Sequence, residues 1–242
     1  MREMRTLSCI VPARNEAGHL NEVLDHVLSV PEITQVIIVE GGSSDNTWEV
    51  ADNYAKKLPD KIFLYRQDKR GKFNAVLTGA KFATGDHIVI WDADGTVPIE
   101  DSRKVISSAM SSGQAAMGNR LLGRIEPGAM QFANYLGNWA FAISWAPLLG
   151  FKPKDLLCGT KIFPRAVFTE MPQWLADIDP YGDFALISHS RSMGIKIESI
   201  TVNYHARTYG ETNINRWRGG MQLLKTTIAI YLSLVTRKFN TK

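Results

Sequence analysis

Cysteine, long apolar runs and a strong charge of one sign are all scarce in this sequence. The two cysteines, Cys9 and Cys158, provide no disulfide framework, so we expect a reducing compartment. The net charge is only +4. This suits an anionic substrate or a membrane surface, and it is too weak to indicate nucleic-acid binding. The N-terminal apolar stretch, residues 7–11, is too short for the core of a signal peptide.

No apolar stretch is suited to cross a bilayer. A membrane-spanning helix needs about 20 predominantly apolar residues. Residues 127–151 carry no charge but include Gln131, Asn134 and Pro147, and residues 226–236 are too few. We therefore expect no transmembrane helix.

The composition that is present belongs to a globular protein with a substantial core. The chain has 242 residues, of which 45% are hydrophobic and 21% charged. No linker, internal repeat or low-complexity segment interrupts it. We therefore predict a single domain over residues 1–242.

The first half of the sequence alternates strand and helix signals. Short apolar runs predict strands, and apolar residues at helical spacing predict helices between them. The strands are expected at residues 7–11, 36–39, 62–65 and 87–91, and the helices at 18–29, 47–57 and 72–83. This order predicts an α/β fold with a mainly parallel sheet covered by helices on both faces. The second half is less regular, with a further strand expected at 196–204.

Three polar clusters follow the predicted strands, at residues 12–16, 40–45 and 92–94. Open α/β sheets bind ligands at the carboxyl ends of their strands, so all three clusters should line one crevice. The pair Asp92 and Asp94 can converge where the chain turns. Their oxygens suit Mg²⁺ or Mn²⁺, which in turn binds diphosphate oxygens. An isolated pair of this kind is more often two solvated turn residues, but its place after the fourth strand favours the metal.

The segment 40–47 has two interpretations of similar weight. Its glycines permit a ligand to approach the backbone closely, and Glu40 can accept a hydrogen bond from a ribose hydroxyl or a base N–H. The same segment also reads as a turn with a helix cap, which Ser44 or Asp45 would provide. Both can hold together.

Taken in order, these motifs resemble glycosyltransferase family 2, whose fold is called GT-A. The matching segments are VPARNE at 11–16, EGGSSDNT at 40–47, RGK at 70–72, ATGD at 83–86 and DAD at 92–94. The downstream half resembles the polyprenyl-phosphate branch, which includes dolichyl-phosphate mannose synthases. Its matches are GNR at 118–120, CGTKIF at 158–163 and RTYGETN at 207–213.

The resemblance implies an inverting transfer of a sugar from a nucleoside diphosphate sugar, with residues 1–118 binding the donor and 119–242 the acceptor. Asp92 and Asp94 match the ribose-binding and metal-binding pair, and Lys72 lies in the segment under the donor. Arg120 and Arg207 match arginines that hold acceptor or donor phosphate. Asp183 matches an acid near the acceptor, either as a general base or as a positioning group. The positions that match the nucleoside site are Pro12, Ala13, Arg14, Glu16 and Glu40.

Four positions depart from the family pattern. Glu40-Gly41 replaces a pair of aspartates, which leaves the base of the donor unassigned. Thr96 stands where the branch often has a glutamine that contacts the metal, so no third protein ligand is assigned. Ala185 replaces a second acid after Asp183.

The aromatic-rich stretch 127–151 and the basic C-terminal part indicate how the acceptor is reached. Trp139, Phe141 and Trp145 are either core residues or the apolar face of helices that lie in a membrane interface. The leading hypothesis is transfer to a polyprenyl phosphate by a cytoplasmic protein attached peripherally to the inner membrane face. The alternatives are a soluble transferase acting on a saccharide or small hydroxyl acceptor, and a non-catalytic nucleotide-binding module. The oligomeric state stays open, a homo-oligomer included.

Overall fold

A single seven-stranded sheet forms the centre of the computed structural model, which describes residues 5–149, 153–207 and 216–240, with residues 216–218 and 234–240 described by their backbone alone. The strand order is β3-β2-β1-β4-β6-β5-β7. Only β6 runs antiparallel to its neighbours, β4 and β5. The strands are β1 (Leu7–Ala13), β2 (Ile33–Glu40), β3 (Ile62–Arg66), β4 (His87–Ile90), β5 (Ala115–Asn119), β6 (Lys161–Pro164) and β7 (Ile197–Thr201).

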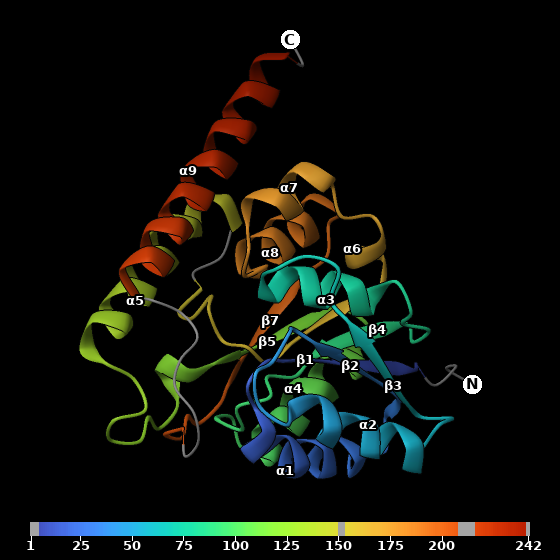
Figure 1. Cartoon of the computed structure of the whole chain (residues 1–242). Coiled ribbons are helices and arrows are strands. Elements are labelled where there is room, and N and C mark those ends of the chain that lie inside the picture. The colour runs from blue at the N-terminus through green and yellow to red at the C-terminus, as the bar shows by residue number, and fades with distance from the viewer. Residues whose placement is uncertain (1–4, 150–152, 208–215, 241–242) are drawn as a thin grey trace.

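Helices cover both faces of the sheet (Figure 1). On one face lie α1 (Ala17–Leu28), α2 (Thr47–Lys57) and α4 (Ile99–Ser112). On the other lie α3 (Lys72–Ala80), α5 (Phe132–Leu149), α6 (Ala166–Thr169), α7 (Gln173–Ile178), α8 (Asp183–Ser192) and α9 (Arg216–Asn240), and a short 3₁₀ turn, η1 (Arg120–Leu122), follows β5.

Each face of the sheet has its own hydrophobic core because alternate strand residues point to opposite sides. In β1, Ile10 packs into the cluster under α3 and α8, whereas Cys9 and Val11 pack into the cluster under α1 and α4. All three side chains are fully buried. A strand buried on both faces reads as a continuous apolar run, which is why the sequence signals β1, β2 and β4 so clearly.

The structure confirms the predicted α/β fold with a mostly parallel sheet. The predicted strands and helices of the first half are all present, and the helix predicted at 47–57 has those bounds. β1 extends two residues beyond the predicted end, through Pro12 to Ala13. The strand predicted at 196–204 is shorter, Ile197–Thr201. The sequence did not predict α4, β5 or β6.

The strand β6 lies between β4 and β5 and pairs with both, which brings the second half of the chain into the middle of the sheet. Ile162 of β6 lies opposite Val89 of β4 and Ala116 of β5. Because β6 runs antiparallel, its first residues lie at the edge of the sheet where β4 ends. Residues just before and at the start of β6 therefore meet the loop that carries Asp92 and Asp94.

The helices α5 and α9 pack against each other on one side of the molecule (Figure 1). The indole Nε1 of Trp145 donates to Thr227 Oγ1 at 3.1 Å, and Tyr231 donates to the backbone of Ser144. Trp145 is thus a core residue. Within the described residues, no helix is both apolar enough and long enough to span a bilayer.

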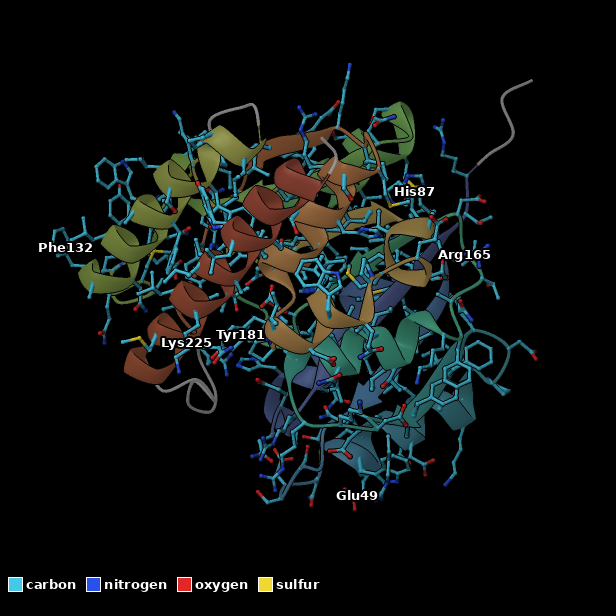
Figure 2. All side chains as sticks on the ribbon, turned by 90° about the horizontal axis from the view of Figure 1, so that it is seen from above. Glu49, His87, Phe132, Arg165, Tyr181 and Lys225 are labelled. Atoms are coloured by element: carbon cyan, nitrogen blue, oxygen red, sulfur yellow. The ribbon has the colours of Figure 1, made fainter. Side chains whose placement is uncertain are left out.

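Both helices also present apolar side chains to the outside. In α5 these recur at the spacing of a single helix face, and Figure 2 shows the first of them, Phe132, projecting from the body of the protein. The exposed apolar residues of α5 are Phe132, Tyr135, Leu136, Trp139 and Ile143, and those of α9 are Met221, Leu224, Ile228 and Leu232. We call these nine residues the α5–α9 apolar face. The stretch 127–151 thus combines the two predicted roles, core and exposed.

Candidate active site

The loops after β1 and β2 are joined by hydrogen bonds between backbone and side chains. Asn15 has a positive φ of 56°, and its Oδ1 accepts from the N–H of Ser44 at 2.8 Å. Its own N–H donates to Ser43 Oγ at 3.0 Å. The N–H of Glu16 donates to Thr47 Oγ1 at 2.9 Å. The clusters 12–16 and 40–45 therefore form one wall of the site, as the sequence predicted.

Glu40 and Gly41 have defined roles in this wall. Glu40 is 3% exposed, and its Oε1 accepts from the N–H of Ser43 at 2.5 Å. Gly41 donates to the carbonyl of Ala13 at 2.9 Å. A Cβ at Gly41 would come within 2.9 Å of Gln67 Oε1 and 3.2 Å of Arg14 Cβ. The predicted turn is present and Glu40 shapes it, but neither Ser44 nor Asp45 is the N-cap of α2: that position is Asn46, and Asp45 Oδ1 accepts from the N–H of Thr47 at 3.0 Å.

The carboxylates that follow β4 are each engaged by a cationic side chain. Asp92 Oδ1 lies 2.5 Å from the Nζ of Lys72, which is the first residue of α3. Asp94 Oδ2 lies 2.8 Å from a terminal nitrogen of Arg207. Asp94 also accepts from the N–H and hydroxyl of Thr96 through Oδ1, at 3.2 and 2.9 Å. Thr96, noted as a departure from the family pattern, therefore orients Asp94.

Arg207 joins Asp94 to the wall formed by the first two loops. Its guanidinium also binds Glu16 Oε1 at 3.1 Å. Burial raises the pKa of Glu16 to about 7, with Asp94 adding to the shift and Arg207 opposing it. Glu16 Oε2 is buried with no hydrogen-bond partner among the described residues. Two carboxyl groups, those of Glu16 and Asp94, therefore share the single guanidinium of Arg207.

Asp92 lies where several positive groups act together. Burial would raise its pKa, but Lys72, Lys161 and Arg120 hold the pKa of Asp92 below its ordinary value. Gly159 packs directly on this carboxylate, since a Cβ there would come within 1.5 Å of Asp92 Oδ2. A glycine is therefore required at this position.

Asp183, the acid expected near the acceptor, is the first residue of α8. Gly182 precedes it with a φ of +82°. The buried side chain of Asp179 accepts from the N–H groups of Phe184 and Ala185, both at 2.9 Å, and so fixes the start of the helix. Asp183 Oδ1 accepts a hydrogen bond from Lys161 Nζ. Asp183 is also close enough to Lys72 to contribute, together with Asp92, to a raised pKa of that lysine against the opposing effect of burial.

Arg120 forms a bidentate ion pair with Asp155 rather than standing free. Its Nε lies 2.7 Å from Oδ2, and a terminal nitrogen lies 3.0 Å from Oδ1. Asn138 of α5 donates to the same Oδ1 at 2.5 Å. The guanidinium carbon lies 4.9 Å from the ring centre of Tyr204. Burial opposes the charges on both partners, yet each stabilises the other, so the pKa of Asp155 is lowered and that of Arg120 is raised.

The structure thus brings most of the predicted site residues to one end of the sheet. Glu16, Asp92, Asp94, Lys72 and Arg207 form one charged cluster, and Asp183 adjoins it through Lys72. The residues of the 208–213 motif lie outside the described part of the chain.

Sequence reasoning did not single out Lys161 or Asp155, which pair with two of the predicted residues. Lys161 was only part of a quoted motif. Its signal is a lysine at the start of an apolar strand, and that of Asp155 is a single acid between lysines and leucines. Both patterns are common at protein surfaces, so the pairing emerges only from the fold.

The residues after β4 suit a divalent cation. Asp92 and Asp94 supply hard carboxylate oxygens of the type that Mg²⁺ and Mn²⁺ bind. Their present partners are side-chain cations, which shows that the site favours positive charge. In the part of the chain that the structure describes, no three His, Cys, Asp or Glu side chains gather as a ready-made metal site. A third protein ligand thus stays unassigned.

The chain belongs to glycosyl transferase family 2, because the model of that family matches residues 8–165. This segment runs from the second residue of β1 to just past the end of β6, and it includes Asp92 and Asp94. The expected family is therefore confirmed.

Two curated relatives extend the match. A dolichyl-phosphate beta-glucosyltransferase of Trichomonas vaginalis is 33% identical over 183 residues, covering 69% of this chain and 52% of that protein. A low-salt glycan biosynthesis hexosyltransferase of Haloferax volcanii is 28% identical over 220 residues, covering 89% and 51%. The chain thus spans about half the length of these relatives.

Solved structures of similar fold confirm the GT-A architecture. A mannosyl-3-phosphoglycerate synthase of Rubrobacter xylanophilus superposes with a TM-score of 0.70 at 17% identity, covering 96% of this chain and 75% of that one. A glucosyl-3-phosphoglycerate synthase of Mycobacterium tuberculosis, solved with Mn²⁺, uridine diphosphate and glucosyl-3-phosphoglycerate, gives a TM-score of 0.63 at 16% identity, covering 93% and 79%.

Proposed function

We propose that this chain transfers a sugar, with inversion, from a nucleoside diphosphate sugar to a polyprenyl phosphate. The observation that carries the proposal is the cluster of alternating charges at the end of β4. There Asp92 and Asp94 face Lys72 and Arg207 beside the loops that follow β1 and β2. Anionic ligands at such a site can exchange places with the carboxylates on the two cations. A diphosphate and a divalent cation together satisfy both sets of charges.

The donor half would work as follows. The joined loops 12–16 and 40–45 receive the nucleoside, and Asp92 and Asp94 hold a Mg²⁺ or Mn²⁺ ion. That ion supplies charge neutralisation for the leaving diphosphate. Lys72 and Arg207 are placed to bind phosphate oxygens once these replace their present carboxylate partners. In the transfer, an acceptor oxygen bonds to the anomeric carbon as the bond to the diphosphate oxygen breaks on the opposite side, which inverts the configuration.

A phosphate acceptor is favoured over a hydroxyl by the charge around Asp183. Lys161 and Lys72 both lie near this carboxylate. A phosphate oxygen is already ionised at neutral pH and needs no general base, whereas a hydroxyl must lose a proton. Asp183 then serves as a positioning group. The similarity to a dolichyl-phosphate beta-glucosyltransferase supports this choice.

The lipid part of the acceptor would approach along the α5–α9 apolar face. This face is tied to the site because Asn138 of α5 holds Asp155, which holds Arg120. Trp139 and Tyr135 have amphipathic rings of the kind that lie at membrane interfaces, and Lys225 on α9 is exposed nearby (Figure 2). We infer peripheral attachment to a membrane surface, with the crevice facing the lipid head groups.

The transfer itself is tested with purified protein, a panel of UDP, GDP, dTDP and CMP sugars, and Mn²⁺ or Mg²⁺. One donor at 100 times its dissociation constant should stabilise the protein by roughly 2.7 kcal/mol in a thermal-shift measurement. With that donor, each nucleotide released in the presence of polyprenyl phosphate should accompany one glycosylated lipid. Transfer only to a water-soluble hydroxyl acceptor would support the soluble transferase instead. Nucleotide binding without any turnover would support a binding module.

Membrane attachment has its own test. We expect the protein to sediment with anionic liposomes, and high salt to weaken but not abolish this, because each basic residue near an anionic surface contributes only about 1 kcal/mol. The combined change of Phe132→Ala and Trp139→Ala should lower the partition coefficient by at least about tenfold, since 1.4 kcal/mol of lost burial has that effect. The matched control is Trp174→Ala, an exposed tryptophan on α7. Equal effects of the two variants would contradict the assignment of the face.

A further inference from the structure

The ammonium of Lys161 lies inside the protein. Its side chain is 1% exposed, at the first position of β6. Removing an ammonium from water costs several kcal/mol unless a partner compensates it. Here the partner is Asp183, whose side chain is 18% exposed and so reaches the surface of the protein. The lysine is thus an internal support for an acid that a ligand can contact.

The segment that carries Lys161 also touches the donor side of the site. Gly159, two residues earlier, packs on Asp92 with no room for a Cβ. Lys161 itself contributes to the lowered pKa of Asp92. A short piece of chain therefore spans from the carboxylate at the donor to the carboxylate near the acceptor. Because β6 is paired on both sides, this spacing is held by the sheet.

The other charged and titratable groups around Asp183 come from α3 and from the turn before α8. Lys72 approaches from α3. Asp179 and Tyr181 lie in the turn before α8, and both have pKa values raised by burial and by neighbouring acids that include Asp183. Asp179 and Asp183 lie so close together that nearby positive charge is needed to stabilise them. Lys161 of β6 and Lys72 of α3 supply this charge.

We propose that Lys161 is a positioning residue for sugar transfer, which holds Asp183 as an oriented carboxylate at a fixed place relative to Asp92. The assignment of Asp183 to the acceptor end rests on the proposed function. The ion pair with Lys161 does not. It follows that one Asp183 oxygen is already engaged by Lys161, and the other is left to orient an acceptor. The acceptor class that matches this arrangement has an oxygen ionised before it binds, as in a phosphate monoester.

The test is a double-mutant cycle with Lys161→Met, Asp183→Asn and the double variant, together with Lys161→Arg. Lys161→Met should lower kcat by at least about thirtyfold with the donor KM within about threefold of wild type, because Asp183 loses its partner whereas Asp92 keeps its direct partner Lys72. In the Asp183→Asn background the same change should cost less than about threefold. Lys161→Arg should keep a higher kcat than Lys161→Met, since a guanidinium preserves the positive charge and can donate to Asp183. Equal losses in both backgrounds would show that Lys161 is only a core residue and would overturn the proposal.

The same four variants also show whether a loss of activity is caused by a failure to fold. Lys161→Met leaves Asp183 without its partner and is the variant at risk, whereas the double variant removes both charges. If the single variant does not fold, a double variant equal to Asp183→Asn together with an active Lys161→Arg supports the role. A further tenfold loss in the double variant overturns it. Hydrolysis of the donor by water is measured alongside transfer. If the wild-type protein does not transfer sugar to polyprenyl phosphate, the proposed acceptor is wrong. The double-mutant cycle, measured on the reaction that the protein does catalyse, still tests the role of Lys161.

Discussion

Replacing Asp94 with alanine should lower turnover at least about a hundredfold, equivalent to about 3 kcal/mol in the barrier. The change removes a carboxylate oxygen from the proposed cation site and leaves the charge of the leaving diphosphate uncompensated. It also releases Arg207, which Asp94 binds at 2.8 Å. The measurement is the initial rate of nucleotide release at saturating donor, over a range of Mn²⁺ concentrations.

The control for Asp94→Ala is Asp60→Ala, an exposed acid in the turn between α2 and β3, which should leave the rate unchanged. Partial rescue of Asp94→Ala at high Mn²⁺ would agree with a weakened cation site. Full activity of Asp94→Ala in excess chelator would exclude the proposed use of the ion. Calorimetric titration of Mn²⁺ in the presence of nucleotide gives an independent measure of the same loss.

Replacing Asp155 with alanine should destabilise the protein by about 3–5 kcal/mol, because it leaves the guanidinium of Arg120 buried without a counter-charge. Asp155 is 1% exposed. It also accepts hydrogen bonds from Asn138 and from the N–H of Leu157 at 3.0 Å, which would lose their acceptor. For a protein of this size such a loss corresponds to a fall in Tm of roughly 10 °C or more. Differential scanning fluorimetry and urea unfolding measure it.

A surface ion pair provides the comparison for Asp155→Ala. Asp52 pairs with Lys56 one turn along α2 at 2.5 Å, with the lysine 73% exposed. Asp52→Ala should cost only about 0.3–0.5 kcal/mol, since water already solvates both groups. Similar losses for the two variants would show that the Arg120–Asp155 pair is not a structural support. Arg120 would then be free to hold phosphate, as the family resemblance implied.

The first half of this protein could be predicted from its sequence because the signals of its strands and helices are local. Fully buried strands such as β1 and β2 appear as apolar runs, and the polar residues that follow them must meet at one edge of a parallel sheet. β5 and β6 give no such signal. β5 consists of Ala, Met, Gly and Asn, and β6 begins with a lysine and ends with a proline. Short strands of this composition form because they pair with neighbouring strands in the folded protein, not because their residues have a high β-propensity.

The charge pairs of the second half of the chain are equally hard to predict from the sequence. Arg120 and Asp155 lie 35 residues apart, and Lys161 and Asp183 lie 22 apart. Nothing in the spacing of either pair follows a helical or strand period. A buried lysine also looks like any other lysine in a sequence, since burial depends on what surrounds it. The resemblance to a family located Asp183 and Arg120, but only the fold shows which groups hold them.

The hydrogen bonds around Asn15 have a consequence for how the donor is bound. A residue with positive φ and a side-chain amide that caps the neighbouring loop fixes both loops in one shape. A nucleoside that enters such a preorganised wall does not need to order it first, so little conformational entropy is lost on binding. More of the contact energy then appears as affinity, and the donor should bind before the acceptor without waiting for a loop to close.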